Sequence, residues 1–273
     1  MFILIFDTTT GLCNQFYDIV NGINFCLKHN ITFTFRYCAF RNKNLTSWKK
    51  KPFNELFDTS FLNQYKLYID YNTIKDDITN ENCFNKDGNL VGHQFLKEDD
   101  ILGQLTNLNK KYIVIPQIWW VYKFRDFVDN TIFNRILPSK HLMDRYVEIK
   151  NTVVNDQQYN FIHYRYEHDF KNYFNLTIES LDSVLKKVRF KEKNLKIFIA
   201  TSNIHKLINL KNPKYNKLLY KDDNLLLDLN YEQCAFIDYM FGLGAQECYG
   251  HKNSSFSVML NTIKNTENYY NLI

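Results

Sequence analysis

The densest group of chemically capable side chains is the run His-Tyr-Arg-Tyr-Glu-His-Asp at residues 163–169. It comes at the end of the apolar segment 159–164, which is typical of a buried strand. In open α/β sheets, ligands bind beyond the carboxyl ends of the strands, where several loops converge. A solvated surface loop with internal ion pairs is the ordinary alternative. Arg165 directly follows the buried strand, and this position favours a binding site over a surface loop.

Arg165 suits an anionic ligand, and a diphosphate in particular. Its planar guanidinium donates two parallel hydrogen bonds and does not lose its charge. If a nucleotide diphosphate is the leaving group, Arg165 would neutralise the negative charge that grows as the bond breaks. Three nearby or N-terminal carboxylates could accept a proton from an attacking hydroxyl group, namely Glu167, Asp169 and Asp18. Glu167 is the candidate that we retain for this catalytic role.

A second candidate lies in the run Ser254-Ser255-Phe256-Ser257, which follows Gly250 at the expected start of a helix. Backbone N–H groups, hydroxyl groups and the positive end of the helix dipole together favour a bound phosphate. Simple capping of the helix by a serine side chain would explain the same residues. The sequence leaves both readings open.

A third candidate is the turn Gly11-Leu12-Cys13-Asn14-Gln15 between the first expected strand and its helix. Gly11 would let the backbone approach a ligand, and the amide of Asn14 can both donate and accept hydrogen bonds. The spacing matches neither the GxGxxG fingerprint of dinucleotide sites nor a P-loop, so both are disfavoured.

Several common catalytic motifs are missing from the sequence. It contains no GxSxG elbow, no HExxH and no DxD triplet of the kind that holds a metal ion under a sugar-nucleotide diphosphate. The acidic pairs at 76–77, 99–100 and 222–223 are typical of surface turns. We therefore expect no metal site and no cofactor, with charge stabilisation supplied by protein donors.

The elements that must position these residues alternate between strands and helices. Residues 2–6 and 31–37 are apolar and typical of strands, and apolar residues recur at helical spacing between them. Such strand–helix–strand units build parallel sheets that carry helices on their faces. A further strand is expected at 112–118, whereas the polar stretch 41–105 indicates loops and short helices.

The second half of the chain repeats this rhythm. Its expected elements are strands at 159–164, 195–200 and 247–249, a short strand within 218–229, and helices at 177–188, at 232–242 and up to Ile263. We therefore predict an α/β fold with two Rossmann-like domains, residues 1–145 and 146–273.

Composition sets the broad class. The chain has 273 residues, of which 45% are hydrophobic and 16% aromatic, so it is a globular protein rather than a disordered one. Its net charge of +5 is spread along the chain, which argues against nucleic acid as a partner, and the basic run 49–51 is typical of a solvated loop. Six cysteines without a CxxC pair indicate free thiols. No segment is typical of a signal peptide or a membrane helix, so we expect a soluble, cytoplasmic protein without membrane insertion.

Four segments together resemble the GDP-fucose protein O-fucosyltransferases and the related plant family. Residues 163–170 are similar to the family's His-Leu-Arg…Asp-Trp segment, with Tyr164 in place of Leu and Phe170 in place of Trp. Residues 238–257 are similar to its Asp-Leu-Tyr…Gly…Ser-Ser-Phe-Thr run. Residues 199–202 and 14–15 resemble its Val-Ala-Thr-Asp and Gly…Asn-Gln segments. The four segments occur in the family's order and span most of the chain.

The resemblance implies a glycosyltransferase-B-like architecture, in which two Rossmann-like domains face a cleft. It implies an inverting transfer of fucose from GDP-fucose, the C-terminal domain holding the donor and no metal ion taking part. By the match, Arg165 binds the diphosphate and stabilises its departure, His163 lines the donor site and Asp238 hydrogen-bonds to the guanine. The remaining matched donor-site residues, expected to hold phosphate and base, are Ser254, Ser255 and Phe256.

Asn14 would lie near the reacting centre from the N-terminal domain. The family can run a dissociative reaction in which the leaving phosphate takes the proton, so a protein base such as Glu167 is not obligatory. The acceptor is expected to be a hydroxyl group of a cytosolic protein or glycan. Transfer from another GDP-hexose, and a non-catalytic module that binds a nucleotide sugar or a glycan, are the alternatives.

Overall fold

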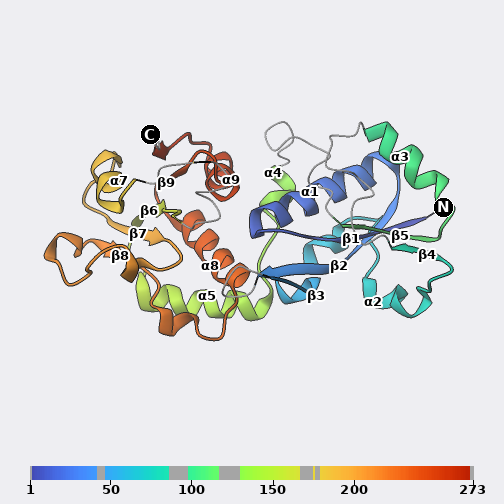
Figure 1. Ribbon diagram of the computed structural model, residues 1–273, viewed down its shortest axis with the longest axis horizontal. Coiled ribbons are helices and arrows are strands. Elements are labelled where there is room, and N and C mark those ends of the chain that lie inside the picture. The colour runs from blue at the N-terminus through green and yellow to red at the C-terminus, as the bar shows by residue number, and fades with distance from the viewer. Residues whose placement is uncertain are drawn as a thin grey trace. The chain divides into compact units, whose positions relative to one another are not determined.

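A computed structural model describes residues 2–41, 47–85, 98–116, 130–166, 175 and 179–270 of the chain. The chain divides into two compact units, residues 1–140 and 141–273, and each is built around its own sheet (Figure 1). The domain boundary predicted between residues 145 and 146 falls slightly later, inside helix α5 (Lys140–Val153).

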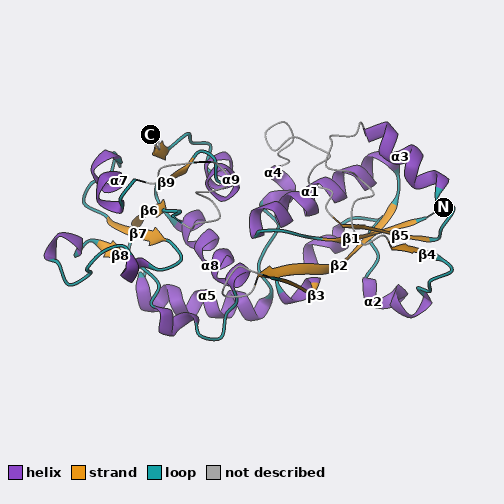
Figure 2. Cartoon of the chain, viewed as in Figure 1, coloured by secondary structure: helices purple, strands orange, loops and turns teal. Residues whose placement is uncertain are grey.

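The first unit combines strands with α-helices and short 3-10 helices, and Figure 2 marks its strands in orange and its helices in purple. Its described elements are β1 (Ile3–Asp7), α1 (Leu12–His29), β2 (Thr32–Arg41), β3 (Trp48–Pro52), η1 (Phe53–Glu55), η2 (Ser60–Gln64), α2 (Tyr71–Ile74), η3 (Lys75–Asp77), β4 (Cys83–Asn85), α3 (Glu98–Asn107), β5 (Tyr112–Pro116) and α4 (Asn130–Phe133).

The strands of this unit form a sheet in the order β3-β2-β1-β5-β4. All neighbours are parallel except the antiparallel pair of β2 and β3. Both faces are covered, as expected for a parallel sheet. Gly22 of α1 packs against the ring of Phe6 on one face, whereas Ile74 of α2 joins Ile5 and Val114 on the other. Helix α1 ends where Asn30 takes the left-handed conformation, at a φ of 54°.

The second unit begins within α5 and contains the second sheet. Its further described elements are β6 (Tyr159–His163), α7 (Leu181–Lys187), β7 (Lys196–Ala200), η4 (Ile204–Lys206), η5 (Pro213–Tyr215), β8 (Leu218–Leu219), η6 (Asp223–Leu226), α8 (Tyr231–Gly244), β9 (Cys248–His251), α9 (Ser255–Ile263) and β10 (Tyr269–Tyr270).

The second sheet is parallel throughout, in the order β10-β9-β6-β7-β8. One face is covered by α7, because Leu181 and Val184 cluster with Ile162 of β6. The other face is covered by α8, where the ring of Phe241 stacks on Phe198 of β7 with centroids 4.1 Å apart. The predicted α/β class with Rossmann-like units is therefore confirmed by both sheets.

One prediction about the first unit is wrong. The basic run Lys49-Lys50-Lys51 is not a loop but part of β3, which pairs along the edge of the sheet with β2. Lysines suit an edge strand, because their charge blocks pairing with a further strand. Lys50 also bonds to Oδ2 of the buried Asp7 carboxylate, and Arg36 donates to both oxygens of the same group.

All six cysteines are free in the structure, as the sequence indicated. Among the described residues, no helix is long and apolar enough to cross a membrane.

Candidate functional site

The carboxyl ends of β6 and β9 lie at the switch point of the second sheet, where the order in which the chain adds strands reverses. From β6 the chain proceeds outward through β7 and β8 on one side, then returns to place β9 and β10 on the other. Ligands of doubly wound folds bind at this kind of switch point. His163 is the last residue of β6 and His251 the last of β9, and helix α9 starts four residues after His251. Two of the three predicted segments therefore converge here.

The hydroxyl group of Ser257 connects these two strand ends. Its Oγ lies 2.8 Å from Nδ1 of His163 and accepts a hydrogen bond of 3.0 Å from the backbone N–H of His251. Ser257 is buried, and Gly250 of β9 packs directly against its side chain. A Cβ atom at position 250 would lie 2.2 Å from Oγ and 2.4 Å from Cβ of Ser257. Only a glycine leaves room for this hydroxyl group.

We expect Gly250→Ala to lower the free energy of unfolding by about 1–3 kcal/mol, because overpacking forces the neighbouring atoms apart. Urea unfolding measures the change. Gly103→Ala is the matched control: Gly103 lies in α3, where an added Cβ atom meets nothing within 4 Å, and the change gains up to about 1 kcal/mol of helix propensity. Equal stability of the two variants would contradict the tight packing at Gly250.

The imidazole of His163 is held on one side by an aromatic ring. Its centroid lies 4.2 Å from that of Phe256, the second residue of α9. Burial, followed by the positive charge of Arg165 and, in acid, by repulsion from a protonated His251, lowers the pKa of His163 to about 3. Burial, with Lys252 and Arg165, likewise lowers the pKa of His251 to about 4, and Nδ1 of His251 accepts from the backbone N–H of Asn253. Both histidines are therefore neutral at physiological pH.

These lowered pKa values predict a loss of stability in acid. Below the ordinary histidine pKa of 6.5, the unfolded chain takes up protons at His163 and His251 that the folded chain does not. The free energy of unfolding therefore falls as the pH drops from 6.5 toward 4, by at most about 1.4 kcal/mol per pH unit for each histidine. Urea unfolding at several pH values should give a shallower slope for His163→Gln than for the wild type. Parallel slopes would contradict the lowered pKa of His163.

The segment that carries Arg165 is fastened to the far edge of the sheet. The hydroxyl group of Tyr270, in β10, donates to the backbone carbonyl of His163 at 2.8 Å and accepts from the backbone N–H of Arg165 at 3.4 Å. The Arg165 side chain thus starts from a fixed piece of backbone at the carboxyl end of β6. Glu167 and Asp169 lie outside the described residues.

The start of α9 differs from an ordinary capped helix. Ser254 occupies the cap position, but its side chain makes no capping hydrogen bond, and its buried Oγ has no hydrogen-bond partner among the described residues. Its backbone N–H donates to the carbonyl of His251 at 2.9 Å. The capping explanation for these serines is therefore wrong. Ser255 and Phe256 follow in the first turn, beside His163.

Asp238 lies on α8 and forms a buried ion pair. Its Oδ1 is 2.8 Å from Nζ of Lys221, and the two side chains are 14% and 4% exposed. Lys221 also donates to the carbonyl of Cys234 at 3.0 Å. The residue after Asp238, Tyr239, meets the ring of Phe256 edge-on with centroids 6.0 Å apart. The contact of Tyr239 with Phe256 connects the helix that carries Asp238 with the start of α9.

The predicted residues of the first unit lie at its own switch point, where β1 separates β2 from β5. Gly11 precedes α1, and Asn14 lies in its first turn with a buried Oδ1 that has no partner among the described residues. Gln15 fixes the turn, because its amide bonds to Thr10 and to both backbone groups of Ala39.

Asp18 is 1% exposed and accepts from the backbone N–H of Thr9 at 2.9 Å. The carboxylate therefore helps to hold the turn, and its assignment as a candidate base stays a prediction.

Four residues hold the second-unit site together in ways that the sequence did not predict, namely Ser257, His251, Tyr270 and Lys221. Ser257 and His251 lie in or next to the run Ser254-Ser255-Phe256-Ser257, and this proximity could have drawn attention to them. Tyr270 and Lys221 act through contacts with other segments of the chain, which the local sequence pattern does not reveal.

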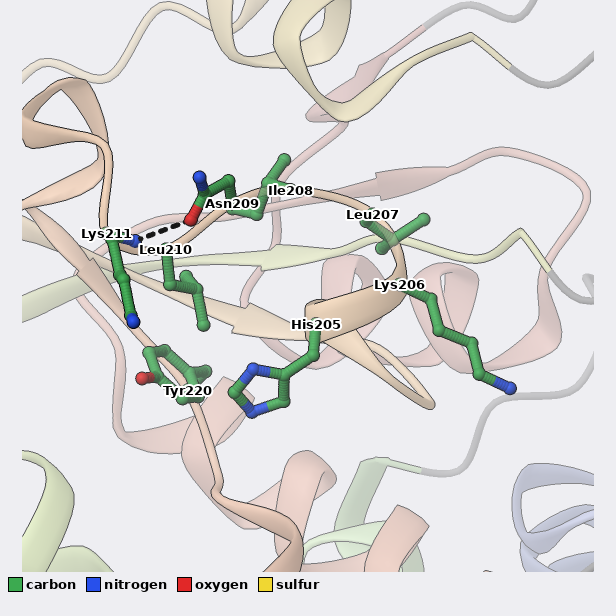
Figure 3. A pocket seen from close by; sticks show the side chains of 8 residues that line it. All are labelled: His205, Lys206, Leu207, Ile208, Asn209, Leu210, Lys211 and Tyr220. Carbon is green, nitrogen blue, oxygen red and sulfur yellow. Dashed lines mark hydrogen bonds between the residues drawn. The ribbon is translucent and has the colours of Figure 1, made fainter.

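A separate hollow of about 720 Å³ lies further along the same sheet, beyond β7 and β8. It is lined by residues 205–211 and by Tyr220 (Figure 3). The side chains of His205 and Lys211 point toward Tyr220, and Lys206 points away. None of the predicted site residues lines this hollow.

Several solved structures share the architecture of this chain. POFUT1 in complex with GDP aligns over 99% of this chain and 98% of its own, with a TM-score of 0.67 and 13% identity. POFUT1 in complex with GDP-fucose aligns over the same shares, with a TM-score of 0.67 and 11% identity. This chain has the fold of these fucosyltransferases.

A bacterial protein shares the same fold. The fucosyltransferase NodZ from Bradyrhizobium aligns over 96% of this chain and 92% of its own, with a TM-score of 0.56 and 12% identity. No family model and no curated protein sequence matches the chain. The fucosyltransferase fold and the resemblance read from the four segments thus agree, although identity is low throughout.

Proposed function

We propose that this chain is an inverting glycosyltransferase that moves fucose from GDP-fucose to a hydroxyl group of a protein or a glycan. One observation carries the proposal. The strand end with His163 and Arg165 and the start of α9 meet at the switch point of a fold whose solved representatives include complexes with GDP and GDP-fucose.

The donor would be held by residues of the second unit. The guanidinium of Arg165 would bind the diphosphate, and the first turn of α9 would bring backbone N–H groups and the hydroxyl groups of Ser254 and Ser255 to a phosphate oxygen. The ring of Phe256 and the carboxylate of Asp238 would contact the guanine. Asp238 can accept hydrogen bonds from the N–H groups of that base.

In the transfer step, the acceptor oxygen forms a bond to C1 of fucose on the face opposite the diphosphate. The bond between C1 and the phosphate oxygen breaks, and its electron pair remains on GDP. Arg165 neutralises this developing charge. The acceptor proton goes to Glu167 or to the departing phosphate. The sequence has no DxD motif, so we assign the charge stabilisation to Arg165 and not to a metal ion.

Calorimetric titration with GDP and GDP-fucose tests the donor assignment. We expect both to bind, and GDP-mannose to bind more weakly if the site selects fucose. Absence of binding at millimolar ligand would overturn the proposal. Addition of EDTA should leave the transfer rate unchanged, whereas a rate restored only by added metal would refute the metal-independent step.

Slow hydrolysis of the donor distinguishes an enzyme from a binding module of the same fold. Incubation of the protein with GDP-fucose in the absence of acceptor should release GDP over hours. If GDP-fucose binds but stays intact with every glycan and protein acceptor tested, the non-catalytic alternative holds instead.

A further inference from the structure

Within the described part of the chain, one acceptor is available to the hydroxyl hydrogen of Ser257. A hydroxyl group has one donor hydrogen and two acceptor lone pairs. One lone pair of Ser257 accepts from the backbone N–H of His251 at 3.0 Å. The other contact of Oγ, at 2.8 Å, is Nδ1 of His163. Ser257 is 1% exposed, so water does not offer an alternative acceptor.

This arrangement determines which nitrogen of His163 carries hydrogen. A neutral imidazole has one donor and one acceptor nitrogen. If Nδ1 carried the hydrogen, it would donate to Oγ of Ser257, and the serine hydrogen would be left without an acceptor among the described residues. A buried unsatisfied donor costs about 1–3 kcal/mol. The arrangement that satisfies every group has hydrogen on Nε2.

The second ring nitrogen of His163, Nε2, has no hydrogen-bond partner among the described residues. Phe256 packs against the ring and Ser257 takes Nδ1, so both the plane and the rotation of the imidazole are fixed. His163 is partly exposed at the carboxyl end of β6, two residues before Arg165.

We propose that Ser257 is a positioning residue that donates its hydroxyl hydrogen to Nδ1 of His163 and so presents a neutral Nε2–H donor to an oxygen atom of the nucleotide sugar. The identity of that ligand rests on the proposed function, whereas the tautomer does not. A neutral donor adds a directed hydrogen bond beside Arg165 without placing a second positive charge in the partly buried site.

Nitrogen NMR of histidine-labelled protein tests the tautomer. The chain has seven histidines, and His163→Gln identifies the signals of His163. In the wild type, without nucleotide, we expect His163 to show the nitrogen chemical shifts of a neutral imidazole that carries its hydrogen on Nε2. We expect Ser257→Ala to move the pattern toward hydrogen on Nδ1 or a mixture, and Ser257→Thr, which keeps the hydroxyl group, to retain it. Hydrogen on Nδ1 in the wild type, or an unchanged pattern in Ser257→Ala, would overturn the inference.

Titration with GDP and GDP-fucose tests the ligand. We expect Ser257→Ala to weaken the binding of at least one of them by about tenfold, the effect of one misdirected hydrogen bond, and Ser257→Thr to restore it. Unchanged affinity for both would mean that Nε2–H does not face the nucleotide sugar. If Ser257→Ala does not fold, the wild-type spectrum and Ser257→Thr still decide the tautomer. If the wild type binds neither ligand, the proposed function fails while the tautomer result stands.

Discussion

Arg165→Ala is expected to reduce the rate of fucose transfer by about 100- to 1,000-fold, which corresponds to about 2.7–4 kcal/mol of transition-state stabilisation. The guanidinium acts where negative charge develops on the diphosphate, so its removal slows the chemical step. The backbone N–H of Arg165, which bonds to Tyr270, survives the substitution and keeps the strand end in place. Steady-state kinetics with GDP-fucose, or donor hydrolysis if the acceptor is unknown, measures the effect.

Two further variants make the result specific. Arg165→Lys keeps the charge but loses the planar fork, so we expect an intermediate rate. Arg189→Ala removes an exposed arginine from the loop that leads into the amino end of β7, whereas Arg165 follows the carboxyl end of β6, and it should leave the rate unchanged. A wild-type rate for Arg165→Ala, with an intact fold by circular dichroism, would remove Arg165 from the proposed mechanism.

Apolar runs predicted the positions of the main strands well, because buried parallel strands have few alternatives. The segment 159–164 becomes β6, and 195–200 becomes β7, with changes of one residue at an end. The rule that ligands bind beyond strand carboxyl ends then singled out Arg165 from a single sequence. No local pattern could show that β9 pairs with β6, since that pairing joins segments more than eighty residues apart in the printed sequence.

The residues that hold the site together were harder to find for the same reason. Tyr270 fixes the backbone on either side of the β6 end from a two-residue strand near the carboxyl terminus. Nothing about a tyrosine in a polar segment distinguishes it from a surface residue. Lys49, Lys50 and Lys51 show the converse error, because a run of charges is as suitable for an edge strand as for a loop. In both cases the long-range partner, not the residue type, determines the role.

The buried pair of Lys221 and Asp238 gives the largest expected effect on stability. We expect Lys221→Met to lower the free energy of unfolding by about 3–5 kcal/mol, because it removes the positive charge that faces the partly buried carboxylate of Asp238. Lys221 follows β8 and Asp238 lies on α8, so the pair also ties the helix to the loop after that strand. Urea unfolding of the purified variant measures the loss.

The chain offers a matched control in Lys51→Met. Lys51 pairs with Glu55 at 2.9 Å, but both side chains are 43% exposed, so we expect a loss below about 1 kcal/mol. The double variant Lys221→Met, Asp238→Asn removes both charges of the pair and should regain part of the stability lost by the single variant. If Lys221→Met costs no more than Lys51→Met, the ammonium group does not hold the Asp238 carboxylate. Another group would then have to orient the Asp238 carboxylate for a contact with guanine.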